Sequence, residues 1–253
     1  MRRVVLGLAS GVAQAIINGE PDRGPNAHPY VGALVSVPVS GEFKGQRLPI
    51  CSGTLISPEV FLTAGHCTDF LMRKDLPTYV SFDPTYKPGE SKVIKATPYP
   101  HPKFCNAAKE GCPRYDAGVA VLKKPVRMST YGALPEAGLV DTLKEGQRLT
   151  AVGYGATRYK IGGGPRPQPV YPEDRNRATV RLLNIKDPDV GETFVKTTGV
   201  SLIRGKGETS CFGDSGGPLF VGDQQTIVGV TSFHMAPCAG DRTTTNGWTY
   251  PEC

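Results

Sequence analysis

The run from Cys211 to Pro218 places one serine, Ser215, among three glycines. Glycines at 213, 216 and 217 accept backbone dihedrals that a side chain forbids, so Ser215 fits on a tight turn. On such a turn the amides of Gly213 and Ser215 point the same way, toward the carbonyl group of a bound substrate. The run therefore indicates a serine nucleophile with an oxyanion hole.

A serine nucleophile needs a base, and two segments upstream supply the partners. His66 lies in the run Leu62–Cys67, and Asp116 lies in the run Tyr115–Leu122. Taken singly, the histidine fits a structural role and the aspartate fits a turn or a helix cap. In the order His66, Asp116, Ser215 they indicate a nucleophile, a base and a carboxylate that orients the base.

These segments resemble those of the trypsin and chymotrypsin family of serine proteases. The resemblance extends from Ile16–Gly19 through Cys51–Ser57 to Gly229–Phe233. It implies a secreted serine endopeptidase that hydrolyses polypeptides through an acyl-enzyme intermediate and that protein inhibitors can bind. No cofactor, nucleic acid or membrane is expected. Calcium occurs in the family, but no acidic loop in this sequence makes a convincing site for it.

The resemblance also implies an all-β fold of two packed six-stranded antiparallel barrels, with the active site in the cleft between them. We expect a leader over residues 1–15 and a protease domain over 16–253, with barrel one at about 30–125 and barrel two at about 145–253. The loop Tyr159–Asp174, rich in glycine and proline, is assigned no regular structure. Strand-like runs are Tyr30–Val37, Cys51–Ser57, Val60–Ala64, Thr78–Phe82, Lys92–Thr97 and Gly118–Leu122 in the first half, and Arg148–Tyr154, Ala178–Asn184, Leu202–Arg204, Pro218–Val221 and Thr226–Phe233 in the second.

One competing hydrolase pattern is present, because Gly213–Gly217 also satisfies the G-x-S-x-G nucleophile elbow of α/β-hydrolases. That elbow requires a helix after the serine and partners in the order Ser, Asp, His. The segment 218–231 instead has the pattern of strand, turn and strand, and His234 is the sole histidine after Ser215. Both observations disfavour the elbow.

The alternative to an enzyme is an inactive protease-like binding module or a truncated fragment. Family members continue past the region of Asn246–Tyr250 along a final strand into a closing helix, and Pro251–Cys253 offers neither. A fragment of this kind would have an incomplete second barrel. Against an inactive module, none of the three triad residues is missing.

The first residues have the pattern of a short secretory leader. Two arginines precede an apolar stretch, and Ala13-Gln14-Ala15 fits the small-residue rule of signal peptidase. A disordered N-terminus remains the alternative. By the resemblance, Asp214 binds the ammonium group of a new N-terminus at Ile16, and we expect the cut to fall after Ala15 without a separate zymogen.

The seven cysteines favour disulfides with one cysteine left over. The resemblance implies pairs Cys51–Cys67 and Cys211–Cys238, whereas spacing alone suggests Cys105–Cys112. Cys253 has no expected partner. Neither a CxxC pair nor a histidine pair at ligand spacing supports the alternative of a zinc site.

Residues beside the nucleophile set the expected preference at the cleaved bond. Thr209, followed by Ser210, occupies the pocket floor where trypsins carry aspartate, so a strict tryptic preference is not expected. Ser232, Phe233 and His234 form the expected wall, and the family usually has glycine where His234 stands. We expect small or medium apolar side chains, with an acidic preference as the alternative.

Composition favours β-structure and argues against nucleic acid as a partner. The 31 glycines and 23 prolines divide short apolar runs, and no long stretch has helical periodicity. The net charge is +6, but the basic residues are scattered along the sequence and are not interleaved with aromatic residues. We therefore expect them to form an ordinary solvated surface.

Overall fold

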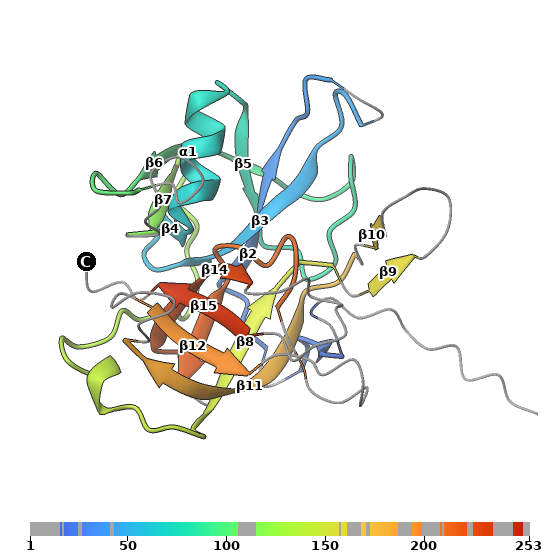
Figure 1. The fold of residues 1–253 in the computed structure, drawn as a ribbon. Helices are drawn as coiled ribbons and strands as arrows, with labels where there is room; N and C mark the ends of the chain where they lie inside the picture. The colour runs from blue at the N-terminus through green and yellow to red at the C-terminus, as the bar shows by residue number, and fades with distance from the viewer. Residues whose placement is uncertain are drawn as a thin grey trace, which may run out of the picture.

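The protein was analysed as a computed structural model that describes residues 16, 18–24, 27–40, 43–105, 115–156, 158–160, 168–170, 173–186, 194–198, 208, 210–221, 225–234 and 245–249. Two β-structures dominate it, one formed by the first half of the chain and one by the second (Figure 1). The first lies in the upper half of Figure 1 with the helix α1, and the second lies below it.

The first half forms a closed barrel of antiparallel strands in the order β2-β3-β4-β7-β6-β5. Strand β2 is buried along its whole length because both of its faces are covered. Leu34 packs into the main core, while Ala33 and Val35 pack with Tyr154 of the second half. The strands are β2 (Val31–Ser36), β3 (Leu48–Leu55), β4 (Val60–Thr63), β5 (Thr78–Ser81), β6 (Ile94–Pro100) and β7 (Gly118–Leu122).

The second half forms a sheet in the order β1-β11-β12-β15-β14-β13-β8. Because β8 also pairs with β11, the strands from β11 to β8 close into a ring, and β1 attaches to its outside. The second six-stranded barrel expected from the resemblance is therefore present. The strands are β1 (Glu20–Pro21), β8 (Arg148–Gly153), β11 (Asn176–Ile185), β12 (Phe194–Thr198), β13 (Pro218–Val221), β14 (Ile227–His234) and β15 (Thr245–Thr249).

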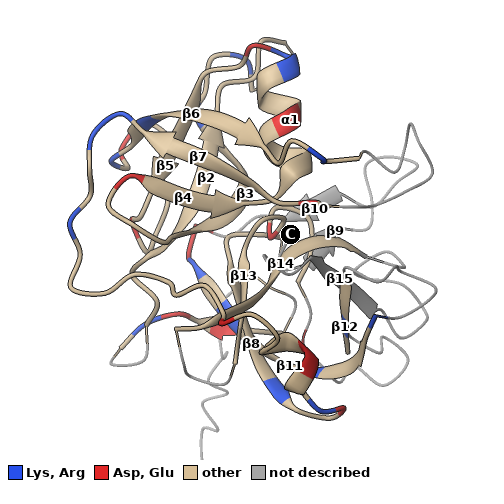
Figure 2. Cartoon of the chain, turned by 90° about the vertical axis from the view of Figure 1, so that its left-hand side faces the viewer, with Lys and Arg blue, Asp and Glu red and all other residues tan. Residues whose placement is uncertain are grey.

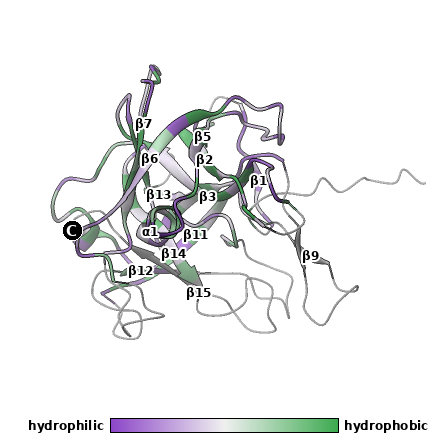
Figure 3. Cartoon of the chain, turned by 90° about the horizontal axis from the view of Figure 1, so that it is seen from above, coloured by the Kyte–Doolittle hydropathy of each residue, from purple (hydrophilic) through white to green (hydrophobic). Residues whose placement is uncertain are grey.

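One of the hydrophobic clusters contains residues from both halves of the molecule. The core cluster of the first barrel includes Val152, Phe220, Ile227 and Val230 from the second half. A separate cluster fills the second barrel and includes the fully buried Ile16. Figure 3, viewed from above, shows hydrophobic stretches in the strands around these cores. Burial of this apolar surface is what fixes the halves against each other.

Apart from one hairpin in a predicted loop, five elements were not predicted from the sequence. These are the helix α1 (Gly65–Arg73), the short 3-10 helix η1 (Val140–Thr142), and the strands β1, β12 and β15. Strand β15 pairs with both β12 and β14 and so completes the ring.

The loop Tyr159–Asp174 also departs from expectation, because β9 (Arg158–Lys160) and β10 (Gln168–Val170) pair as an antiparallel hairpin. The expected strand Leu202–Arg204 lies outside the described residues. No helix in the part of the chain that the structure describes has the length and apolar character needed to cross a membrane.

Candidate active site

His66 stands at the start of α1, directly after strand β4. The helix begins against the Asp116 segment, where a Cβ on Gly65 would lie 2.8 Å from the carbonyl oxygen of Ala117. Only glycine permits that approach. One residue after the histidine, Cys67 forms a disulfide with Cys51 of β3, which ties the helix to the barrel wall.

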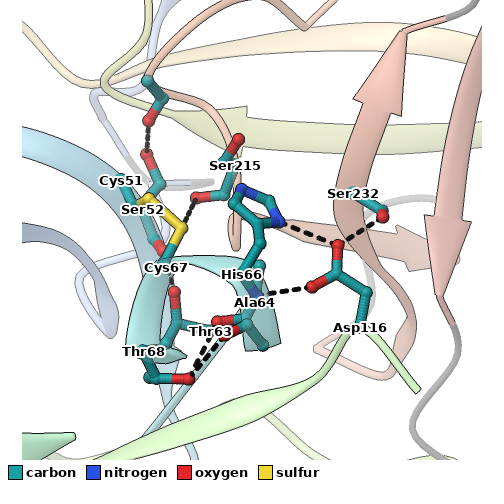
Figure 4. Close-up of a disulfide and its surroundings, with 12 residues drawn as sticks. Cys51, Ser52, Thr63, Ala64, His66, Cys67, Thr68, Asp116, Ser215 and Ser232 are labelled. Carbon is teal, nitrogen blue, oxygen red and sulfur yellow. Dashed lines mark hydrogen bonds and ion pairs between the residues drawn. A yellow bond between two sulfur atoms is a disulfide. The ribbon is translucent and has the colours of Figure 1, made fainter. Parts of the chain in front are cut away.

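Asp116 holds His66 at two points (Figure 4). One carboxylate oxygen accepts the backbone N–H of His66 at 2.7 Å, and the other lies 2.8 Å from the Nδ1 atom of the imidazole. Ser232 donates its hydroxyl to the second oxygen. Asp116 is only 5% exposed, so these partners replace water around the carboxylate. The arrangement fixes the ring orientation and leaves Nε2 for chemistry.

Charge and burial act against each other at this pair. Burial by itself lowers the pKa of His66, but the charge of Asp116 and its hydrogen bond outweigh burial, so the pKa lies above its ordinary value. Burial by itself raises the pKa of Asp116, and the charge of His66 with the hydrogen bonds from His66 and Ser232 brings it below its ordinary value. The pair therefore favours an ionised carboxylate beside a histidine of increased basicity.

Ser215 lies on a turn that the first barrel holds in place. The backbone N–H of Ser52, on β3, donates to the carbonyl oxygen of Ser215 at 2.8 Å. The Ser52 hydroxyl donates to the carbonyl oxygen of Gly213 at 2.9 Å and accepts the N–H of Tyr154 at 2.9 Å. In Figure 4 the imidazole of His66 lies between Asp116 and Ser215. Residues from both halves thus meet at one place.

The glycines around Ser215 adopt conformations that other residues rarely reach. Gly213 has φ +94° and Gly216 has φ +82°. A Cβ on Gly216 would lie 2.1 Å from the hydroxyl oxygen of Thr63 and 2.4 Å from the carbonyl oxygen of Ser52. The turn can pack this closely against the first barrel only because residue 216 is glycine.

The amides of this turn fall into two groups. Those of Asp214, Gly216 and Gly217 donate to backbone carbonyl oxygens at 2.8 to 2.9 Å. Among the described residues, no hydrogen bond uses the N–H of Gly213 or of Ser215. These two donors match the expected oxyanion pair, and they are available to an acceptor from outside the chain.

Asp214 is buried, and no cation among the described residues forms an ion pair with it. It is 1% exposed, and its carboxylate accepts the N–H of Gly155 at 2.8 Å and of Cys211 at 2.7 Å. Burial raises the pKa of Asp214 to about 7, although the two backbone hydrogen bonds oppose the shift. Within the described residues no ion pair or hydrogen bond joins Ile16 to Asp214. Ile16 follows Ala15 in this chain and has no ammonium group, so their pairing stays a prediction.

The expected specificity residues are only partly described. The hydroxyl of Ser210 is buried and has no hydrogen-bond partner among the described residues. Phe233 packs edge-on against Phe194 with ring centroids 5.2 Å apart. Ser232 directs its hydroxyl to Asp116. Thr209 and the side chain of His234 lie outside the described residues.

The disulfide Cys51–Cys67 is confirmed. Cys105 and Cys211 are each disulfide-bonded, and their expected partners Cys112 and Cys238, like Cys253, lie outside the described residues. In the described part of the chain the sulfur atoms of Cys51 and Cys67 lie within 4.8 Å of a ring nitrogen of His66. Sulfur atoms joined in a disulfide are not thiolates, so this group is not a zinc site.

Ser52 is the functional residue that sequence reasoning missed. Its position next to Cys51 was visible, but its role depends on a turn that lies far away in the sequence. Ser232 also makes a contact that the sequence did not predict, because its hydroxyl donates to Asp116.

Comparisons with known proteins agree with this geometry. The sequence model of the trypsin family matches residues 17–248. Spermosin from Halocynthia roretzi is 30% identical over 88% of this chain, which spans 57% of the spermosin sequence. Kallikrein-11 from Mus musculus is 28% identical over 96% of this chain and 82% of its own length.

Solved structures show the same fold. HL collagenase superposes with a TM-score of 0.65 at 20% identity, with 93% of each chain covered. Neuropsin from mouse brain gives a TM-score of 0.65 at 21% identity, with 93% of this chain and 94% of neuropsin covered. The family match over most of the chain, together with the paired barrels and the His66–Asp116 geometry, shows that this protein belongs to the trypsin family of serine endopeptidases.

Proposed function

We propose that this chain is a secreted endopeptidase that cleaves peptide bonds with Ser215 as nucleophile, His66 as general base and acid, and Asp116 as the orienting carboxylate. The observation that carries the proposal is that Asp116 holds both the backbone and the ring of His66 while that ring stays partly exposed beside Ser215. Asp22 holds His28 in the same two ways, but the ring of His28 is buried and has a structural role. At His66 the hold presents Nε2 on the side where Ser215 lies.

The reaction proceeds in two balanced halves. The Ser215 hydroxyl oxygen attacks the peptide carbonyl carbon while its proton passes to Nε2 of His66, and the carbonyl electron pair moves onto oxygen. The C–N bond then breaks, and the same proton leaves with the amine, which gives an acyl-enzyme. Water repeats the sequence, with its proton taken by His66 and returned to Ser215. Asp116 stays ionised throughout.

The free amides of Gly213 and Ser215 would receive the negative charge on the former carbonyl oxygen. Removing one such donor costs about 3 to 4 kcal/mol of transition-state stabilisation in comparable sites. Because the turn is fixed by Ser52 and by its glycines, these donors need no reorganisation during the reaction.

For the cleaved bond we propose small or medium apolar side chains before the cut. Thr209 brings no fixed negative charge to the expected pocket floor, and the buried hydroxyl of Ser210 supplies one polar group there. The opposing possibility is an acidic preference through His234, Thr209 and Ser210. A peptide panel that varies only the residue before the cut separates these two outcomes, and strict cleavage after Lys or Arg would refute both.

We also propose that maturation releases Ile16 as a new N-terminus whose ammonium group pairs with Asp214. Support comes from the burial of Asp214 without an ion pair to any described residue and from the burial of Ile16 in the second barrel core. A buried, unpaired carboxylate is costly, so pairing would stabilise the nucleophile turn. N-terminal sequencing of secreted protein tests this, since a start other than Ile16 contradicts it.

The activity itself is tested with a fluorophosphonate probe on secreted protein. We expect covalent labelling that disappears in Ser215→Ala and is strongly reduced in His66→Ala, since both must act for Ser215 to displace fluoride from phosphorus. Peptide hydrolysis should be lost in the same variants. Folded, Ile16-started protein that resists the probe would instead support an inactive protease-like binding module.

A further inference from the structure

Basic residues that are distant in the sequence meet on the outer surface of the first barrel. Lys95 of β6 lies directly opposite Tyr79 of β5, and its carbonyl oxygen accepts the N–H of Lys123 at 2.8 Å. The guanidinium carbon of Arg47 lies 5.0 Å from the centre of the Tyr79 ring. Arg47, Tyr79, Lys95 and Lys123 therefore form a continuous line across neighbouring strands, which we call the basic row.

The placement of these cations next to one another does not stabilise the folded barrel. Residues opposite each other on antiparallel strands share a face with Cβ atoms about 5 Å apart, and like charges there destabilise the sheet. Lys95 and Lys123 are such a pair, because Ala96 lies opposite Leu122 on the antiparallel strands and the two lysines are the next residues beyond that pair. Both lysines and Arg47 are exposed, and none belongs to an ion pair in the described residues.

A pocket begins two residues after Lys123, the last member of the basic row. Lys123 is followed by the exposed Lys124, and then by Pro125, which lines a pocket of about 570 Å³. The pocket wall combines apolar groups with the exposed cation Arg127 and one carboxylate, Glu59. The lining residues are Ser57, Pro58, Glu59, Val60, Pro125, Arg127, Met128 and Tyr131. Figure 2 shows Lys and Arg segments along the left edge, where β6 begins and where the chain leaves the barrel.

This surface lies at the end of the barrel that faces away from the catalytic residues. Strand β7 begins at Gly118, two residues after Asp116, and ends at Leu122, one residue before Lys123. At about 3.3 Å per residue, the chain from Asp116 to Lys123 spans roughly 20 Å. A ligand held at the basic row therefore does not touch His66, and substitutions there leave the reacting groups in place.

We infer that the basic row and its adjoining pocket bind an acidic segment of a polypeptide that also carries an apolar side chain. Carboxylates placed along the row would relieve the repulsion between Lys95 and Lys123. The net charge, which is +6 for the full sequence and +4 without Arg2 and Arg3 of the leader, would attract the segment at long range. The apolar wall formed by Val60, Met128 and Tyr131 favours a polypeptide over a sulfated sugar chain, which has no apolar group to place there. Binding at this surface does not depend on the proposed catalytic function.

The test is direct binding of a fluorescent twelve-residue peptide of eleven glutamates with one central phenylalanine. Matched probes replace every glutamate by glutamine, or the phenylalanine by serine, and a sulfated oligosaccharide serves as the other class of anion. The protein is the full chain with Ser215→Ala, so that no probe is cleaved. Lys95→Glu with Lys123→Glu reverses the row, and Lys74→Glu with Lys144→Glu makes the same charge change at exposed sites elsewhere.

We expect the reversed row to weaken binding of the acidic peptide at least tenfold and the control pair to weaken it less than threefold. Affinity should fall as salt rises, and the glutamine probe should not bind. Met128→Ala should weaken the phenylalanine probe and leave the serine probe unchanged. Equal binding by the two charge variants, no binding by the unaltered row, or tighter binding of the oligosaccharide than of the peptide would each overturn the inference.

Discussion

At the scale of single residues, the site depends on how many partners Asp116 has. One carboxylate oxygen accepts the backbone N–H of His66, and the other lies beside the Nδ1 atom of its ring. The second oxygen also accepts the hydroxyl of Ser232. These contacts keep the carboxylate ionised although it is buried. The carboxylate in turn raises the basicity of the imidazole, so the protonation state of one residue is set by another.

Asp116→Asn should remove the charge that raises the pKa of His66. In the unaltered enzyme the acid limb of the pH profile of kcat/KM should have its midpoint above the ordinary histidine value of about 6.5, because His66 acts as a base only when neutral. The substitution should move that midpoint to lower pH and reduce kcat by about 10⁴-fold, a magnitude taken from the template enzyme of this family. A pH profile with a small ester substrate checks both. An unmoved acid limb would show that another group controls it.

The sequence proposed His66, Asp116 and Ser215 as catalytic residues because each stands in a distinctive local run, and the structure shows the contact between the first two. The sequence did not indicate the hydroxyl groups that contact these segments. Ser52 and Ser232 act across the contact between the two halves, and nothing local distinguishes them from other buried strand serines. Roles of that kind become visible only when the docked arrangement is known.

At the scale of elements, strand β3 of the first barrel supports the turn that carries Ser215, the proposed nucleophile. Ser52 contributes its backbone N–H to Ser215 and its hydroxyl to Gly213, and the same hydroxyl accepts the N–H of Tyr154. Ser52 therefore fixes the position of this turn relative to the helix that carries His66.

Ser52→Ala should lower both stability and activity. Loss of the hydroxyl leaves the buried N–H of Tyr154 without its acceptor, at a cost of about 1 to 3 kcal/mol. The Gly213 peptide also becomes free to shift, so kcat should fall while KM for a small ester stays nearly constant. Urea unfolding and ester kinetics measure the two effects.

The matched control is Ser57→Ala, whose hydroxyl accepts the N–H of Val60 in the turn between β3 and β4 and has no other hydrogen bond within the described residues. That variant should lose less than 1 kcal/mol and keep its kcat. If both serine variants behave alike, Ser52 has no special role at the turn.

Elements were predicted where the local pattern was strong and missed where distant pairing decides. Strands β2, β4 and β7 are short apolar runs and were found close to their observed bounds. Strand β15, with the sequence Thr-Asn-Gly-Trp-Thr, has weak strand propensity and depends on pairing with β12 and β14. Helix α1 is only nine residues long, and its disulfide and buried Leu71 stabilise it in place of a long periodic pattern.

At the scale of the whole molecule, a buried charge cluster joins the N-terminal segment to both halves. Asp22 accepts a hydrogen bond from Arg175 at 2.7 Å and lies 2.8 Å from Nδ1 of His28, and all three side chains are buried. Arg175 also donates to the carbonyl oxygen of Val31 on β2 at 3.0 Å. Arg175 directly precedes β11, so the cluster connects the start of that strand in the second barrel with β2 of the first.

Arg175→Met should destabilise the protein by about 3 to 5 kcal/mol, because it leaves the carboxylate of Asp22 buried with reduced compensation. Arg73→Met, at the exposed pair with Asp69 on α1, should cost less than about 1 kcal/mol. Chemical denaturation of both variants measures the difference. Comparable losses would mean that the buried pair has no more effect than a surface pair.

The stability of the unprocessed chain should depend on pH through Asp214. Its pKa of about 7 in the folded state exceeds the ordinary value of 3.8, so the folded chain holds this proton more tightly than the unfolded chain. The contribution is fully present below pH 3.8 and is lost as pH rises to about 7, by at most about 4 kcal/mol at 1.4 kcal/mol per pKa unit.

A chain produced with Ile16 as its first residue should not show this loss, since an ammonium group would then face the carboxylate. Urea midpoints of the long and short chains at pH 5 and pH 8 test the difference. The same decline in both chains would exclude pairing between Ile16 and Asp214.

Because the proposed nucleophile Ser215 and the proposed base His66 belong to different halves of the molecule, catalysis would depend on the contact between these halves. A small displacement of one half relative to the other, without exposure of either core, would move the Ser215 hydroxyl away from Nε2 of His66 and abolish activity. Under heat or denaturant, activity would then be lost before either barrel unfolds. The time for which activity persists would depend on the hydrogen bonds by which Ser52 joins the two halves.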